Sequence, residues 1–400
     1  MGNETRKIIY CDYSATTPVL PEVIDEMQRV MREAWGNPSS VHQFGRSAKV
    51  ELEYARETIA DTLHAARNEI IFTSGGTESD NFALRGLAAA LQEKGRHIIT
   101  SKVEHHAVLH TCQSLEKQGF AVTYLDVDDY GGVTPETVEN AIRDDTILIS
   151  IMHANNEIGT INPIAGIGEI ARRYGIAFHS DAVQTYGKLP LNVRNLPVDA
   201  LSVSGHKIYG PRGIGFLFIR RDFDITPLLT GGSQERNLRA GTENLPAIAG
   251  LARAARLSLE HQSKETVRLC QLQARLEAGI RDSLPGTIIH GHPERRLPGL
   301  TSLGFEDVDG ESLVMNLDMR GIMVSSGSAC SSGSVNPSHV LLAMGYDRRG
   351  AKNAIRISLG RSNTKEDIPY ILQGLQEETE RIRQATRKRK SAGNTVTASP

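Results

Sequence analysis

One cysteine of this sequence stands in surroundings that suit a reactive thiol. Cys330 lies in the run VSSGSACSSGSVNPSH, among small polar residues that bury little surface and stay mobile. A linker of this composition has no need of a thiol, and the run separates two strongly patterned segments. The pattern therefore indicates either a hinge with an incidental cysteine or a nucleophile on a movable arm.

The other three cysteines carry no comparable signal. Cys11, Cys112 and Cys270 are scattered, without a CxxC pair and without the spacing of zinc ligands. We interpret them as small hydrophobic residues of a reducing compartment, and the sequence predicts no metal site.

Three further segments place polar side chains where strands are expected to end. In TSGGTESDN, two glycines precede a helix whose free N–H groups can hold a phosphate, although Thr77 could equally be a helix cap. In HSDAVQ, Asp181 is either a cap or the partner of a cation. In SGHKIYGPRGIG, Lys207 is either a surface lysine or one that forms a Schiff base with a carbonyl.

Taken together, the three segments indicate a pyridoxal 5′-phosphate site. That cofactor requires a phosphate cup, a carboxylate that keeps its pyridine nitrogen protonated, and a lysine that holds its aldehyde as an imine. The chain supplies these groups in the order phosphate loop, Asp181, Lys207.

Composition excludes several other classes of protein. The 400 residues are 39% hydrophobic and 23% charged, with a net charge of −2. That balance gives no reason to expect direct nucleic-acid binding. The longest apolar runs are too short to span a bilayer, and MGNETRKIIY lacks the apolar region of a signal peptide. We therefore expect a cytoplasmic protein with no membrane partner.

The elements that must position these residues alternate between short strands and helices. Such alternation predicts an α/β fold with a mostly parallel sheet sandwiched by helices, in which ligands bind beyond the carboxyl ends of the strands. Seven strands are expected in the first part of the chain: EIIFTS, HIIT, AVTYLDV, TILISIM, IAFHSD, ALSVS and GIGFLFI.

A helix over 247–283 is expected to connect two domains. The first is a large cofactor-binding domain, residues 15–260. The second is a smaller α/β C-terminal domain formed by residues 1–14 and 261–386, which carries the cysteine loop. Residues 387–400 are basic and then polar, and we expect them to be disordered.

The chain resembles the cysteine desulfurases of the fold-type I pyridoxal-phosphate enzymes, within the class V aminotransferase superfamily. These proteins are sulfur donors in iron–sulfur cluster assembly. The resemblance runs from YCDYSATTPV to IRISLGRSNTKEDI and leaves only the tail uncovered. Its most specific motifs are GNPSSVH, TSGGTESDN, EHHAV, MHANNEIGT, HSDAVQ, SGHKIYGPRGIG, RAGTEN and SSGSACSSGS.

The resemblance implies a role for individual residues around the cofactor ring. Lys207 is implied as the Schiff-base lysine and Asp181 as the partner of the pyridine nitrogen. His105 would stack on the ring and shuttle protons. Gln184 would donate to the ring oxygen beside the imine, and Asn156 would contact that oxygen or the substrate.

It also implies the groups that hold the phosphate and the substrate. The implied phosphate ligands are Gly76, Thr77, Ser204 and His206, together with Thr242 from the second subunit of a homodimer. Arg356, assisted by Asn37, would bind the carboxylate of L-cysteine.

The implied reaction converts L-cysteine into L-alanine and a persulfide on Cys330, which supplies sulfur for iron–sulfur cluster assembly and tRNA thiolation. Lys207 is the expected base, and either His105 or the substrate imine would take the thiol proton. The alternatives are a selenocysteine lyase, another class V aminotransferase, and an inactive scaffold of the same fold. Cys330 favours the desulfurase. The acceptor would be a cluster scaffold or a tRNA-thiolating enzyme, and the sequence does not say which.

Overall fold

The computed structural model describes residues 7–326 and 336–394. Its centre is a seven-stranded sheet in the order β2-β8-β7-β6-β5-β3-β4. Neighbouring strands are parallel except that β8 runs antiparallel to both β2 and β7. The strands are β2 (Ile70–Thr73), β3 (His97–Ser101), β4 (Ala121–Leu125), β5 (Thr146–Ser150), β6 (Ala177–Asp181), β7 (Ala200–Ser204) and β8 (Gly215–Ile219).

Every strand expected for this sheet is present, and the predicted fold class is confirmed. The strands are largely apolar because helices cover both faces of the sheet. In β2, Ile70 and Phe72 belong to one hydrophobic cluster and Ile71 to the other, as the two-residue period of a strand requires.

The helices of this part of the chain divide between the two faces. The cluster that contains Ile70 also takes side chains from α1, α2, α6 and the first half of α7, whereas α3 and α4 cover the opposite face. These helices are α1 (Pro21–Glu33), α2 (Gln43–Leu63), α3 (Gly76–Leu91), α4 (His106–Glu116), α5 (Pro135–Asn140), α6 (Ile164–Tyr174) and α7 (Leu245–Ser283). Short 3-10 turns occur at Arg67–Glu69, Gly205–Lys207 and Gln234–Asn237.

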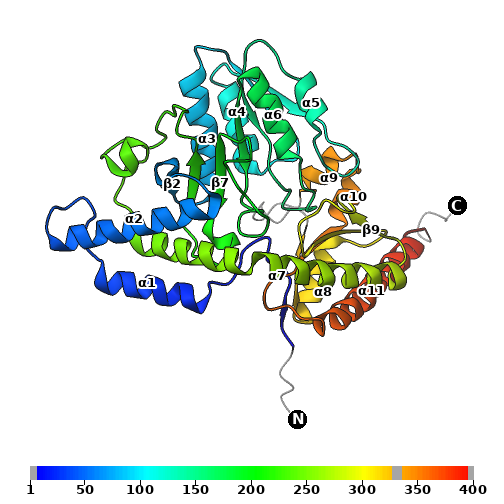
Figure 1. Cartoon of the computed structure of the whole chain (residues 1–400). Helices are drawn as coiled ribbons and strands as arrows, with labels where there is room; N and C mark the ends of the chain where they lie inside the picture. The colour runs from blue at the N-terminus through cyan, green and yellow to red at the C-terminus, as the bar shows by residue number, and fades with distance from the viewer. Residues whose placement is uncertain (1–6, 327–335, 395–400) are drawn as a thin grey trace.

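The helix α7 continues without interruption from the large sheet to a smaller one (Figure 1). The smaller sheet has the order β12-β13-β10-β9, and β1 pairs with β11 beside it. Its elements are β1 (Ile9–Tyr10), β9 (Thr287–His290), β10 (Leu300–Phe305), α8 (Gly310–Met319), β11 (Ile322–Met323), β12 (Ser325–Ser326), α9 (His339–Ala343), α10 (Arg348–Lys352), β13 (Ala354–Ser358) and α11 (Asp367–Asn394).

The smaller sheet has a hydrophobic cluster of its own. The buried residues of this cluster are Ile9, Cys11 and residues between positions 272 and 375. The buried residues of the cluster between α7 and the large sheet lie between positions 23 and 257. The predicted division near residues 14 and 260 falls between these two sets. The division into two domains itself stays a prediction.

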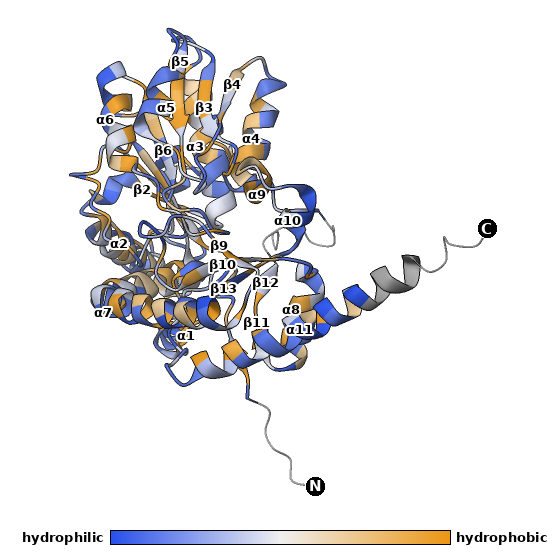
Figure 2. Ribbon diagram, turned by 90° about the vertical axis from the view of Figure 1, so that its right-hand side faces the viewer, coloured by the Kyte–Doolittle hydropathy of each residue, from blue (hydrophilic) through white to orange (hydrophobic). Residues whose placement is uncertain are grey.

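The C-terminal helix extends into the segment for which disorder is expected, and the expectation for residues 387–400 stays a prediction. α11 runs to Asn394, and residues 395–400 lie outside the described part. The segment RKRKSAGN lacks apolar periodicity, but arginine, lysine and alanine are strong helix formers that extend a helix without packing. Figure 2 shows α11 leading away from the body of the molecule. Within the described residues, no helix combines the length and the apolar character that crossing a membrane requires.

A buried ion pair fixes the loop that precedes α7. Arg56 of α2 donates two hydrogen bonds of 2.7 Å to the Glu235 carboxylate, which also accepts from the Phe72 N–H at 3.0 Å. The side chains of Arg56 and Glu235 are only 3% and 2% exposed. Glu235, Arg236 and Asn237 all have positive φ, an unusual conformation for residues with a side chain. The ion pair therefore holds a loop that would otherwise relax.

We predict that Arg56→Ala lowers the free energy of unfolding by about 3 kcal/mol or more, because the Glu235 carboxylate is left buried without its partner. Arg29→Ala is the matched control. Arg29 pairs with three glutamates, Glu26, Glu33 and Glu51, but its side chain is 36% exposed, so a loss below about 1 kcal/mol is expected. Urea unfolding of both variants measures the difference, and equal losses would contradict the role given to Glu235.

Candidate active site

A cavity at the carboxyl ends of the parallel strands collects most of the residues that the sequence singled out. Of the residues predicted for the site, ten line this cavity: Gly76, Thr77, His105, Asn156, Asp181, Gln184, Ser204, His206, Lys207 and Arg356. Asn37 and Thr242 do not line it, and both are exposed. Cys330 lies outside the described residues.

The backbone at the start of α3 forms one wall of the cavity. Gly75 has a φ of 147°, which residues with a side chain rarely adopt. A Cβ on Gly76 would lie 2.7 Å from Cγ2 of Val183, so a side chain at position 76 would have to displace Val183. Because the first N–H groups of α3 have no partner within the helix, this end suits an anion. An open hollow continues past Thr77, Ser204 and His206 and adds Arg212, a cation that the sequence analysis did not name.

Asp181 ends β6 and lies at the floor of the cavity. Its Oδ1 accepts from the Val183 N–H at 2.8 Å. Burial raises its pKa to about 6, although that hydrogen bond and the charge of Lys207 oppose the rise. Asp80 of α3 is also buried and lines the same cavity, and its Oδ1 has no hydrogen-bond partner. Burial and then the charge of Asp181 raise the pKa of Asp80.

Lys207 ends the 3-10 turn that follows β7. Its Nζ donates to the backbone oxygens of Ser14 and Ala15 at 2.7 and 2.8 Å. The N-terminal segment therefore holds the lysine beside Asp181, with which it shares the cavity.

His105 caps the N-terminus of α4, and its Nδ1 accepts from the Ala107 N–H at 3.1 Å. Burial, and then the charge of Lys207, lower the pKa of His105 to about 4. The ring is therefore neutral at pH 7. Since Nδ1 accepts, the proton of the neutral ring resides on Nε2.

Arg356 projects from β13 and is 2% exposed. Its Nη1 donates to the Asn156 backbone oxygen at 2.9 Å and its Nη2 to Asp12 Oδ1 at 2.7 Å. Its Nε has no hydrogen-bond partner. The guanidinium is thus aimed by protein contacts and keeps a donor for a further group. Asn37 is not beside it, because its Oδ1 accepts from the Ser39 N–H of its own turn.

Comparison with known proteins identifies the family. The model of the class V aminotransferases matches residues 9–371. The cysteine desulfurase IscS of Methanosarcina thermophila is 52% identical over 377 residues, 94% of this chain and 93% of the relative. The putative cysteine desulfurase IscS 1 of Bacillus subtilis is 49% identical over 90% of this chain and 95% of its own length. The chain belongs to the cysteine desulfurases.

Solved structures agree with this membership of the cysteine desulfurases. A NifS-like protein superposes with a TM-score of 0.87 at 41% identity, covering 93% of this chain and 99% of that one. A NifS-like protein from Rickettsia africae superposes with a TM-score of 0.84 at 34% identity, covering 94% of this chain and 100% of that one. SspA in complex with cysteine superposes with a TM-score of 0.78 at 39% identity, covering 88% of this chain and 98% of that one.

The class V family depends on pyridoxal 5′-phosphate, and the residues of this cysteine desulfurase fit that cofactor. The unpartnered Oδ1 of Asp80 and the raised pKa of Asp181 show two buried acids whose ionised forms a further cation would stabilise. A protonated pyridine nitrogen is such a cation. The backbone at Gly76 suits a phosphate, and Lys207 lines the same cavity.

Several residues of this site were not assigned a role from the sequence. Asp12 and Ser14 orient Arg356 and Lys207, and each contacts a side chain more than 190 positions away. Asp80 and Glu104 stand inside motifs that were recognised, TSGGTESDN and EHHAV, so a search for acidic residues within those motifs would have found them.

Glu104 is the acid that fixes the start of α4. Its side chain is fully buried. It accepts from Ser101 Oγ at 2.6 Å and from the Met152 N–H at 3.0 Å, which joins the ends of β3 and β5. Burial raises the pKa of Glu104 to about 8 from an ordinary value of 4.5. The folded protein therefore keeps a proton that the unfolded chain releases above pH 4.5.

This proton makes the stability of the cofactor-free protein depend on pH. The contribution of Glu104 is fully present below pH 4.5 and is lost as pH rises towards 8. Glu104→Gln removes this dependence. Between pH 5.5 and 7.5 the free energy of unfolding of the variant, relative to that of the wild type, should therefore rise by about 1 kcal/mol per pH unit. Urea unfolding at the two pH values measures the gain. A difference that does not change with pH would show that Glu104 is already ionised.

Proposed function

We propose that this cysteine desulfurase converts L-cysteine into L-alanine and carries the sulfur as a persulfide on Cys330. The observation that carries the proposal is the single cavity that unites Lys207, Asp181, His105 and Arg356 at the strand ends. A relative at 39% identity, SspA, has been solved in complex with cysteine, which supports cysteine as the substrate class.

The residues of the cavity divide the work. Bound pyridoxal 5′-phosphate supplies an aldehyde and a ring that delocalises negative charge from the substrate Cα. Asp181 holds the ring nitrogen, while Gly76, Thr77, Ser204 and His206 hold the phosphate. Lys207 moves the Cα proton at its Nζ, which two backbone oxygens position.

Arg356 and His105 act on the substrate side. Arg356 binds the substrate carboxylate with guanidinium N–H groups that are left over after the hydrogen bonds to Asp12 and to the Asn156 backbone oxygen. Asn156 lines the same part of the cavity. His105 presents an N–H at Nε2 at neutral pH, which can donate a hydrogen bond to the reacting groups. To accept the Cys330 proton at Nδ1, it must first release the Ala107 N–H.

Sulfur transfer balances without any further oxidant. The Cβ–S bond of the substrate breaks, a new S–S bond forms with Sγ of Cys330, and the Cβ gains the proton that completes alanine. A thiolate suits this attack because sulfur is polarisable, and a hydroxyl does not. This chemistry is the reason to favour a desulfurase over an aminotransferase, which has no use for Cys330. An inactive scaffold would have no need to keep Lys207, Asp181 and Cys330 together.

We propose further that the protein acts as a cytoplasmic homodimer and hands its sulfur to an iron–sulfur scaffold or a tRNA-thiolating enzyme. Trp35 and Phe44 support dimerisation, because they are 65% and 50% exposed and their ring centroids lie 4.7 Å apart, which makes one exposed aromatic pair. In such a dimer Thr242, exposed in the single chain, would reach the partner's phosphate site, and Asn37 would assist Arg356.

Cys330→Ser is expected to retain the yellow cofactor but to reduce sulfide release to background. The serine hydroxyl cannot take up sulfur, whereas cofactor binding does not involve this side chain. The measurement is sulfide and alanine formed from L-cysteine with dithiothreitol, beside the visible spectrum. Cys270→Ser is the control, since Cys270 is an exposed free cysteine that should not matter. Sulfide release by Cys330→Ser at the wild-type rate would refute the role of Cys330.

Lys207→Ala is expected to abolish covalent attachment of the cofactor and to lower turnover about 100-fold or more, because the base is removed. After borohydride treatment, the mass of the wild-type chain should increase by that of the reduced cofactor, and the mass of the variant should not. Lys94→Met, at an exposed position, should behave as the wild type. Attachment in Lys207→Ala would show that another lysine carries the cofactor.

A further inference from the structure

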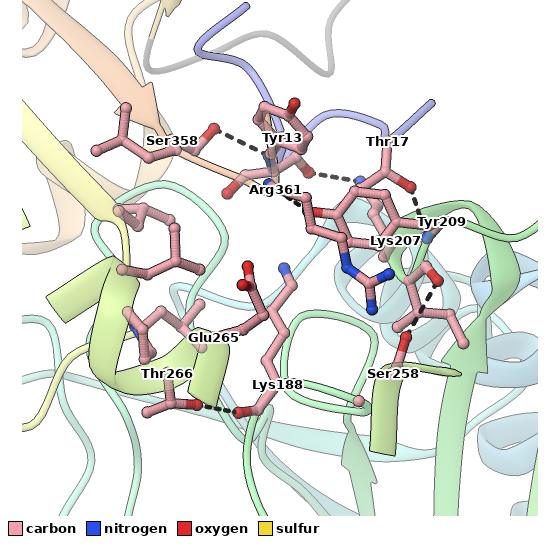
Figure 3. A pocket seen from close by; sticks show the side chains of 18 of the residues that line it. Tyr13, Thr17, Lys188, Lys207, Tyr209, Ser258, Glu265, Thr266, Ser358 and Arg361 are labelled. Carbon is pink, nitrogen blue, oxygen red and sulfur yellow. Dashed lines mark hydrogen bonds between the residues drawn. The ribbon is translucent and has the colours of Figure 1, made fainter. Parts of the chain in front are cut away.

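A second cavity lies behind Lys207. Figure 3 shows Lys188, Lys207 and Glu265 around it, together with aromatic side chains from the N-terminal segment and the turn after Lys207. Ser14 and Lys207 also line the active-site cavity, so the two cavities adjoin at the catalytic lysine. The mechanism above makes no use of Lys188.

The amine of Lys188 contacts the active site through one side chain. Its Nζ donates to Gln184 Oε1 at 3.2 Å. At its other end, Gln184 donates from Nε2 to the Ser14 backbone oxygen at 2.9 Å, and Lys207 donates to that same oxygen at 2.7 Å. Lys188, Gln184, Ser14 and Lys207 therefore form one hydrogen-bonded chain between the two cavities.

This chain fixes which way the Gln184 amide points. An ammonium group only donates and a backbone oxygen only accepts, so the amide oxygen must face Lys188 and the amide nitrogen must face Ser14. An NH₂ group has two hydrogens, and Ser14 takes one. Because Gln184 also lines the active-site cavity, the second is available to an acceptor there.

The helix that connects the two sheets fixes the position of Lys188. Thr266 of α7 donates to the Lys188 backbone oxygen at 3.1 Å, and Gln262 of α7 donates to that of Leu189 at 2.9 Å. Figure 3 shows the Thr266 contact beside the cavity. The lysine is therefore held at a defined place.

We propose that Lys188 is a positioning residue for the cofactor, which it serves by holding the Gln184 amide with its nitrogen towards the cofactor ring oxygen. This inference rests on the proposed function, because it requires pyridoxal 5′-phosphate in the active-site cavity.

The charge of Lys188 acts in the same place. Burial, and then the charges of Lys207 and Arg356, lower the pKa of Lys188 to about 7. Titratable and charged groups face Lys188 or its cavity from the N-terminal segment, the turn after β7, α7, β13 and the turn after β13. They are Tyr13, His206, Lys207, Tyr209, Glu265, Arg356 and Arg361. A positive charge at Lys188 opposes protonation of the nearby nitrogen of Lys207.

The test is a double-mutant cycle with Lys188→Met and Gln184→Leu, read by cofactor binding and not by turnover. Methionine keeps an unbranched side chain of similar length but has no donor. The cofactor-free proteins are titrated with pyridoxal 5′-phosphate, and the absorbance of the bound cofactor is followed against pH. Lys94→Met is the control for loss of an exposed lysine.

Lys188→Met should bind the cofactor about fivefold more weakly, as expected for one lost hydrogen bond. The pH midpoint of the absorbance change should rise by about half a unit, because a nearby positive charge has gone. In the Gln184→Leu background, Lys188→Met should cause no further loss of affinity, since it acts through Gln184.

Two results would overturn the inference. In the first, Lys188→Met has the same cofactor affinity and the same pH midpoint as Lys94→Met. In the second, Lys188→Met weakens cofactor binding by the same factor in the Gln184→Leu background as in the wild type. If Lys188→Met does not fold, the cycle is run with Lys188→Gln, whose shorter side chain does not reach the Gln184 oxygen. Failure of the wild type to bind the cofactor would refute the proposed function. If the wild type binds the cofactor and Lys188→Met has the same cofactor affinity and pH midpoint as the wild type, only the role of Lys188 is refuted.

Discussion

The carbonyl oxygen of Ser14 is the contact on which the organisation of the site depends. It accepts from the catalytic lysine and from Gln184. The Ser14 N–H donates to Ser358 Oγ at 2.9 Å, and Ser358 is the last residue of β13, the strand that carries Arg356. A short stretch of backbone near the N-terminus thus joins the large sheet, which supplies the cofactor site, to the small sheet, which supplies the substrate arginine. Neither sheet would place these groups without it.

The electrostatics of the site follow from the same enclosure. Burial raises the pKa of the acids and lowers that of the histidines, so at neutral pH the histidines are uncharged and the acids hold protons more tightly than in water. Charge in the cavity is then supplied mainly by Lys207 and Arg356 and balanced by Asp181. Such a site favours a ligand with an anionic end and a cationic ring.

Sequence reasoning found what local chemistry determines. The apolar strands, the glycines before α3 and the polar residues at strand ends could be predicted, because parallel strands bring their carboxyl ends to one edge. The direction of β8 could not, since a buried strand is equally apolar in either orientation. Ser14 and Asp12 could not be predicted as site residues because their partners are distant in the chain. The last turns of α11 could not be predicted because their sequence has helix propensity but no apolar periodicity. Asn37 and Thr242 do not line the cavity, and their roles stay predictions.

The unbroken helix α7 has a consequence for the evolution of this protein. Over its 39 residues, about 58 Å at 1.5 Å per residue, the two sheets are attached to one rigid rod. Inserting a single residue would turn everything beyond it by about 100°, and Arg356 would no longer face Lys207. Surface loops can therefore change length freely among relatives, whereas α7 must keep its phase.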